Sequence, residues 1–183
     1  PRAEVADLTP ARREALSAAF EGARLVVPAG GLKVRSNDCD YVFRPHTAFA
    51  WLTGLGADRE PDAVFVLEPL AEGGHEAQIF FRPLAGRDTE EFFADARYGE
   101  FWVGPRPVEE DIRRELGLDA RHVDQLEADL EADAERLRVV PDADREMTEL
   151  VRRVRGDAAG VAGQAARAQD DELAHAASVL RLV

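Results

Sequence analysis

The run Ala63-Val64-Phe65-Val66-Leu67 gives the strongest strand signal in the chain. Continuous apolar residues rich in β-branched and aromatic side chains are typical of a strand buried on both faces. Pro61 precedes the run, and the turn residues Glu72-Gly73-Gly74 follow it. Residues 77–82 then predict a second strand, so we expect the two strands to pair as a hairpin at the heart of a sheet.

The segments on either side of this hairpin predict alternating helices and strands. Before it, we expect a helix that begins at Thr9-Pro10 and ends near Gly22, a short buried strand over 24–28, an extended polar segment over 34–43, and a short helix from Thr47 to Gly54. After it, we expect helices over 89–93, 108–116 and 124–134, a strand over 137–140, a helix from Asp144 to Gly156, and a final helix or exit segment over 170–182.

This alternation predicts a single α/β domain of three layers, in which a mixed β-sheet is flanked by helices. The length of 183 residues fits one compact domain or a domain with an appendage. The composition, with 45% hydrophobic and 32% charged residues, is ordinary for a globular protein.

Charge and composition exclude several function classes. The 23 basic and 36 acidic residues give a formal charge of −13, which argues against nucleic acid as a partner. No apolar run approaches the roughly 20 residues that cross a bilayer, and no signal peptide is visible at the start. The single cysteine, Cys39, cannot form an internal disulfide, so we expect a cytoplasmic location and no membrane partner.

The residues show no catalytic machinery of their own. The four histidines lack the spacing of a metal motif, and no nucleophile elbow, dinucleotide-binding loop or phosphate-binding loop is present. Two stretches stand out instead. Residues 35–54 interleave polar, charged and aromatic side chains, which fits a salt-bridged loop or one wall of a recognition surface. Residues 101–107 place Trp102 and Arg106 on a Gly/Pro-stiffened loop, where Trp102 is either an interface anchor or a cover for its own core.

These two stretches also carry a family resemblance. The runs Arg35-Ser36-Asn37-Asp38, Tyr41-Val42-Phe43-Arg44, Phe49-Ala50-Trp51-Leu52-Thr53-Gly54 and Glu60-Pro61, followed by Trp102-Val103-Gly104-Pro105-Arg106, are similar to the N-terminal domain of Xaa-Pro aminopeptidases (aminopeptidase P), in the creatinase/prolidase group. The longer stretch 55–59 departs from the family pattern. The resemblance implies an N-terminal α/β domain over 1–155, with a fold likened to ribonuclease H. Residues 156–183 would be a linker and helix that lead to a catalytic domain beyond this chain.

The resemblance implies a hydrolase as the parent protein, which removes the N-terminal residue from peptides with proline in second position. Two divalent metal ions, usually manganese, would lie in the catalytic domain, and none of their ligands maps onto this chain. We therefore expect this fragment to be catalytically inactive. Its partners would be its own catalytic domain, further copies in a dimer or tetramer and, through the full enzyme, Xaa-Pro peptides.

The resemblance also suggests which residues lie at a substrate cleft or subunit interface. In tetrameric members the loop that matches Trp102 approaches a neighbouring subunit's active site, so Trp102 is the first candidate. Arg106 is a weaker one and fits a loop-fixing salt bridge better than a substrate clamp. Arg35, Asp38, Tyr41 and Arg44 would form a hydrogen-bonded cluster at a domain or subunit interface, with a structural role favoured.

Two other functions fit parts of the sequence. The chain is alternatively a stand-alone protein- or peptide-binding module, because related domains occur in proteins without peptidase activity. The likeness to ribonuclease H also suggests a nuclease, but the negative charge disfavours one.

Overall fold

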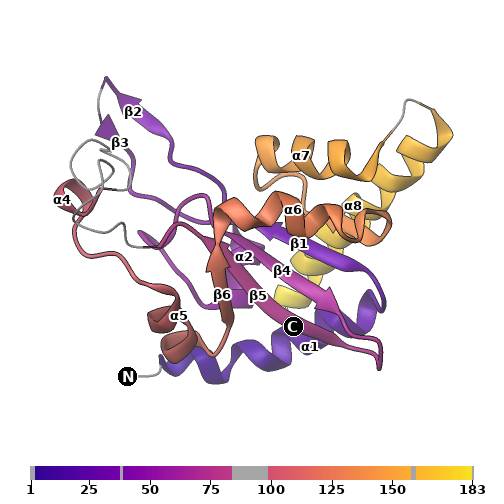
Figure 1. The fold of residues 1–183 in the computed structure, drawn as a ribbon, viewed down its shortest axis with the longest axis horizontal. Coiled ribbons are helices and arrows are strands. Elements are labelled where there is room, and N and C mark those ends of the chain that lie inside the picture. Colours follow the sequence, from indigo (N-terminus) through magenta and orange to yellow (C-terminus); the bar gives the residue numbers. More distant parts are fainter. Residues whose placement is uncertain (1–2, 38, 84–98, 158–159, 183) are drawn as a thin grey trace.

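The computed structural model describes residues 3–37, 39–83, 99–157 and 160–182. Its centre is a five-stranded mixed sheet in the order β6-β5-β4-β1-β7 (Figure 1). The hairpin of β4 (Val64–Pro69) and β5 (His75–Phe81) is antiparallel, and β1 (Arg24–Pro28) is antiparallel to β4 on its other side. The outer strands β6 (Asp119–His122) and β7 (Leu137–Val139) run parallel to β5 and β1. The apolar run Val64–Leu67 therefore lies in the middle strand.

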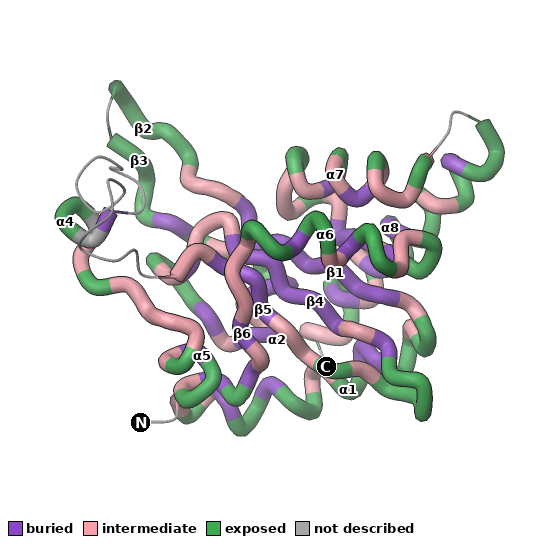
Figure 2. The backbone as a smooth tube through the Cα atoms, in the orientation of Figure 1, coloured by how far each residue is buried: buried purple, intermediate pink, exposed green. Residues whose placement is uncertain are grey.

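Helices cover both faces of the sheet, as the three-layer prediction requires. Phe65 and Leu67 point to one face, whose core also holds residues of α1 (Thr9–Ala19), α2 (Thr47–Thr53), α5 (Glu109–Leu116) and α8 (Val161–Val179). Val64 and Val66 point to the other, where α6 (Leu126–Glu131) and α7 (Arg145–Arg155) pack. Successive strand residues alternate between faces, so the continuous apolar run supplies both cores at once. Figure 2 shows the buried strands between the two helical layers.

The remaining short elements connect these layers or project from them. They are η1 (Glu4–Asp7), β2 (Val34–Ser36), β3 (Cys39–Asp40), α4 (Glu100–Val103), η2 (Val123–Gln125), η3 (Ala134–Arg136) and η4 (Leu180–Leu182). The strands β2 and β3 form a separate two-stranded sheet. Within the described ranges, no helix is long and apolar enough to cross a membrane.

Most element ends fall where glycine or a capping side chain predicts them. Gly54, Gly117 and Gly156 follow their helices in the left-handed conformation, and the Asp144 carboxylate accepts from the Met147 amide at 3.0 Å. Thr9 and Thr47 are the first residues of α1 and α2, and neither is the residue that precedes and caps its helix. Leu8 precedes α1, and the residue before α2 is His46, whose Nδ1 accepts from the Ala48 amide at 3.3 Å.

Three elements differ from expectation, and the first is the short helix α4, which holds Trp102 where the sequence predicted a loop. The strand β6 was not predicted, because its four residues are mostly polar and lie at a sheet edge. The helix α8 begins at Val161 rather than at residue 170, since its alanine-rich first turns are good helix formers. The helix predicted over 89–93 lies outside the described residues.

The helix α8 is fastened to the sheet by a buried ion cluster, formed by Arg155, Asp157 and Asp170. Asp170 is fully buried, and its carboxylate accepts hydrogen bonds from both Nη atoms of Arg155 at 2.9 Å. One of its oxygens also accepts from the Val139 amide of β7 at 3.0 Å. Asp157 accepts two further bonds from Arg155 at 2.7 Å. Burial lowers the pKa of Arg155, but these hydrogen bonds outweigh it and hold the pKa above its usual value. Leu173 of α8 is buried in the core, and a boundary at residue 155 stays a prediction.

Candidate functional site

The extended stretch singled out in the sequence forms a projecting hairpin. We call residues 33–44 the hairpin segment. Its strands β2 and β3 pair through Val34 with Asp40 and Ser36 with Cys39, and Asn37 between them has a φ of 42°. Phe43 is 4% exposed and anchors the segment in the core, whereas Val42 is 67% exposed. The segment projects at the end of the molecule opposite α7 and α8 (Figure 1).

A surface groove of about 470 Å³ runs along the base of the hairpin segment. Its lining combines two cations, a phenol and apolar surface, from Gly31, Lys33, Tyr41, Val42, Phe43 and Arg44. Tyr41 is 59% exposed, and its amide donates to the Lys33 carbonyl at 2.9 Å, which holds the two walls of the groove together. A volume of this size falls within the range of small-molecule and peptide sites.

The residues predicted to cluster here are only partly brought together. Tyr41 and Arg44 line the same groove, Arg35 lies exposed on β2 outside its lining, and Asp38 is outside the described residues. Among the described residues, no side-chain hydrogen bond or ion pair joins Arg35, Tyr41 and Arg44 to one another. An interface role for them stays a prediction, and the groove residues that sequence reasoning missed are Lys33 and Val42. Lys33 carried one signal, since it is the only lysine in the sequence.

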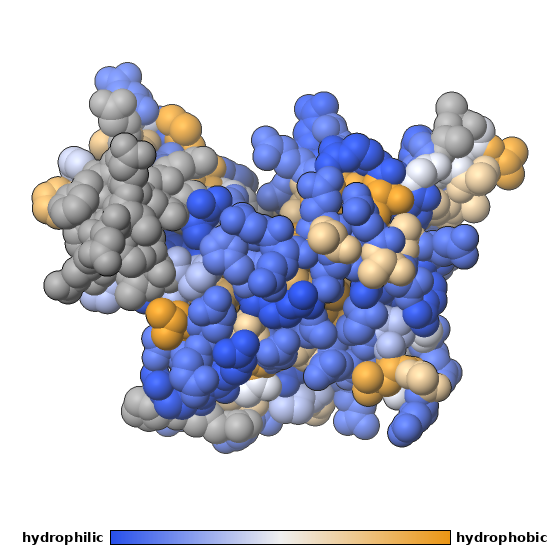
Figure 3. Space-filling model, in the orientation of Figure 1, coloured by the Kyte–Doolittle hydropathy of each residue, from blue (hydrophilic) through white to orange (hydrophobic). Residues whose placement is uncertain are grey.

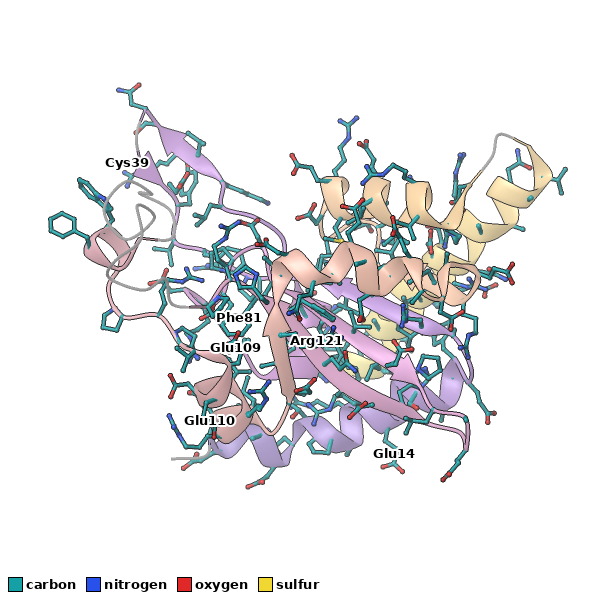
Figure 4. All side chains as sticks on the ribbon, in the orientation of Figure 1. Glu14, Cys39, Phe81, Glu109, Glu110 and Arg121 are labelled. Carbon is teal, nitrogen blue, oxygen red and sulfur yellow. The ribbon has the colours of Figure 1, made fainter. Side chains whose placement is uncertain are left out.

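The second stretch forms the short helix α4, which bears two exposed aromatic rings. Phe101 is 63% and Trp102 is 59% exposed. Their ring centroids lie 5.3 Å apart, with an interplanar angle of 82°, an edge-to-face arrangement. Trp102 is therefore not a buried core residue, and an interface role for it stays a prediction. Figure 3 shows apolar surface at the corner where α4 and the hairpin segment project, and the labelled Cys39 marks that segment in Figure 4.

Arg106 fixes the loop that follows α4. Its guanidinium lies 3.2 Å from the Glu60 carboxylate and donates to the Arg82 carbonyl at 2.7 Å. The side chains of Arg106 and Glu60 are only 8% and 5% exposed. Burial raises the pKa of Glu60 above its usual value, and the attraction of Arg106 and Arg59 opposes this rise. Arg106 thus makes the ion pair that the loop-fixing interpretation predicts, and Glu60, at a φ of 48°, is the partner that sequence reasoning did not assign.

Within the described ranges, no group of three or more His, Cys, Asp or Glu side chains is placed to hold a metal ion. The exposed groups are aromatic rings and cations, which suit binding. Fold and site together define an α/β domain with exposed aromatic rings and a groove lined by two cations at one end of the molecule.

Comparison with known proteins places this domain in a family. The family described as aminopeptidase P, N-terminal domain, matches residues 10–140. The chain is 40% identical over 187 aligned residues to Xaa-Pro aminopeptidase 1 of Streptomyces coelicolor, covering 100% of this chain and 34% of that protein. It is 45% identical over 139 residues to Xaa-Pro aminopeptidase 2 of the same organism, covering 75% and 29%. The chain belongs to the aminopeptidase P N-terminal domain family, and it spans about a third of the length of these relatives.

Solved structures give the same fold. Aminopeptidase P from Escherichia coli, in its low-pH form, superposes with a TM-score of 0.63 at 20% identity, over 80% of this chain and 32% of that one. Proline aminopeptidase P II from Yersinia pestis gives a TM-score of 0.55 at 25% identity, over 69% and 26%. These likenesses confirm the predicted mixed α/β fold.

Proposed function

We propose that this chain is the non-catalytic N-terminal domain of a metal-dependent Xaa-Pro aminopeptidase. The whole protein removes the N-terminal residue from peptides with proline in second position, in the cytoplasm and as a homo-oligomer. Two divalent metal ions, manganese by preference, supply a metal-activated water in the catalytic domain. The family membership and the names of the relatives support this proposal.

The domain contributes a wall of the substrate cleft or a subunit contact. The observation that carries this role is the exposed Phe101–Trp102 pair, because aromatic anchors on short, fixed segments are the residues that interfaces bury. The Arg106–Glu60 ion pair holds the base of that segment. Trp102 therefore packs against a bound peptide or a neighbouring surface, and it takes no part in the bond-breaking step itself.

Kinetics of the full-length protein test this role. Trp102→Ala should lower kcat/KM several-fold for longer Xaa-Pro peptides, with bound metal unchanged, since its ring contacts substrate beyond the scissile bond. Leu70→Ala is a matched control, because Leu70 is another exposed apolar residue, 49% exposed, in the β4–β5 turn. Unaltered kinetics in Trp102→Ala would remove the cleft role.

The 183-residue chain itself should not hydrolyse a Xaa-Pro peptide when supplied with manganese. Measurable turnover by the chain alone, abolished by a chelator, would overturn the assignment of a non-catalytic domain.

The alternative function is a stand-alone protein- or peptide-binding module. The same exposed rings favour it, because they need no catalytic domain in order to bind a partner. The two functions are separated by assaying the complete gene product for Xaa-Pro hydrolysis, since a pure binding module has no such activity.

A further inference from the structure

The groove at the base of the hairpin segment has a charge unlike that of the rest of the molecule. The chain as a whole carries a net charge of −13. The hairpin segment holds three cations, Lys33, Arg35 and Arg44, against the two acids at positions 38 and 40, for a balance of 3 − 2 = +1. Lys33 and Arg44 line the groove, and none of the lining residues that the structure describes is acidic. Asp62 approaches Gly31 at one end of the groove without lining it.

Among the described residues, the two cations of the groove also differ from several arginines elsewhere in having no partner. Arg24 pairs with Glu68, Arg106 with Glu60 at 3.2 Å, and Arg155 with Asp170 at 2.9 Å. Among the described residues, the side chains of Lys33 and Arg44 make no ion pair and no hydrogen bond. Two cations without partners that line the same groove attract an anion. A guanidinium can donate two parallel hydrogen bonds to a carboxylate.

The rest of the lining favours an anionic group that is part of a peptide. Tyr41 adds a phenolic donor, and Val42 and Phe43 add an apolar wall beside the two cations. In a peptide, a carboxylate can contact the cations and the phenol while neighbouring apolar or main-chain atoms contact the apolar wall. A polyanion such as nucleic acid would instead be repelled by the acidic body of the domain.

We propose that this groove is a carboxylate-binding subsite for peptides, with Lys33, Arg44 and the Tyr41 hydroxyl as its donors. The subsite deepens the proposed function, on which its biological role rests, because it would favour Xaa-Pro peptides that carry a free C-terminal carboxylate or an acidic side chain. Both sources present the same chemical group, and peptide design separates them.

The test is a titration of the isotope-labelled 183-residue chain, followed by amide NMR shifts, at low salt and with EDTA present. Three peptides are compared: Ala-Pro-Gly-Gln with a free C-terminus, Ala-Pro-Gly-Glu as the amide, and Ala-Pro-Gly-Gln as the amide. At least one of the first two peptides should bind roughly five- to tenfold more tightly than the third. The amide shifts should be centred on residues 31–44. Whichever peptide binds more tightly identifies the source of the carboxylate.

The double variant Lys33→Gln/Arg44→Gln should bind all three peptides equally weakly. Arg145→Gln is the matched control for lost charge, because Arg145 is 90% exposed on α7 and pairs with Glu149. Equal affinity for the three peptides in the parent chain, or an equal loss in Arg145→Gln, would overturn the subsite.

This experiment needs no catalysis, so its result is independent of the proposed activity. If the full-length protein hydrolyses Xaa-Pro peptides but the 183-residue chain shows no preference for a carboxylate, the subsite is rejected and the proposed function is kept. Carboxylate binding without hydrolysis would retain the subsite and favour the binding-module alternative.

Discussion

The two ends of the molecule use their charged residues in opposite ways. At the end formed by α7 and α8, Arg155 is buried and satisfied by Asp157, Asp170 and the Leu137 carbonyl. At the other end, Arg44 faces a groove with no partner among the described residues. Aromatic residues differ in a related way, since Phe65 of the middle strand is fully buried and Trp102 at the projecting end is 59% exposed.

This difference separates structural residues from those available for binding. A buried ion pair costs desolvation energy, and it is retained where several hydrogen bonds fix elements in one arrangement. Exposed cations and rings contribute little to stability, so substitutions there leave the fold intact and act on binding. Mutations at the two ends should therefore produce opposite phenotypes.

The largest expected effect is on stability, from Asp170→Ala in the ion cluster. The change leaves Arg155 buried with one carboxylate fewer and removes the acceptor for the Val139 amide. The free energy of unfolding should fall by about 3–5 kcal/mol, measured by denaturant titration. Glu149→Ala, which breaks an exposed pair on α7, is the control and should change it far less. A loss in Asp170→Ala no larger than in the control would contradict a structural role for the cluster.

A smaller, pH-dependent effect is expected from Glu60→Gln. Burial raises the pKa of Glu60, so the folded state binds its proton more tightly than the unfolded state does. The parent chain therefore loses stability as pH rises from the usual glutamate pKa through the raised one, and Glu60→Gln removes this dependence. The free energy of unfolding of Glu60→Gln minus that of the parent should increase with pH over this window and then level off. A difference that stays flat, or that decreases, would show that the Arg106 ion pair dominates instead.

The smallest effect on stability is expected at the exposed end. Trp102→Ala should alter the free energy of unfolding by no more than about 0.5 kcal/mol, because more than half of its surface is already in water. Thermal and denaturant unfolding of the variant and the parent measure the change. A loss comparable to that of Asp170→Ala would mean that Trp102 is a core residue.

The sequence predicted the sheet better than it predicted the candidate site. The buried strands over 24–28 and 64–67 follow from local apolar runs, and the left-handed helix ends follow from Gly54 and Gly117. The edge strand β6 lacked such a run, so its position depends on pairing with β5, which no local pattern encodes.

The candidate site depended on long-range packing, which explains what was missed. The pairing of Glu60 with Arg106 joins residues 46 positions apart. The groove needs the turn of the hairpin segment to bring Lys33 beside Arg44. The composition of the loop around Trp102 and the family resemblance around Arg44 singled out these two residues, but neither could show which cations would be left without a partner.

Hydrogen exchange tests the central claim most directly, by comparing the 183-residue chain with the full-length protein. If the exposed end binds the rest of the enzyme, amides of residues 39–44 and 100–103 should exchange markedly more slowly in the full-length protein. Amides around the ion cluster, such as that of Val139, should exchange at similar rates in both. Unchanged exchange at the hairpin segment and α4, with new protection elsewhere, would contradict the account.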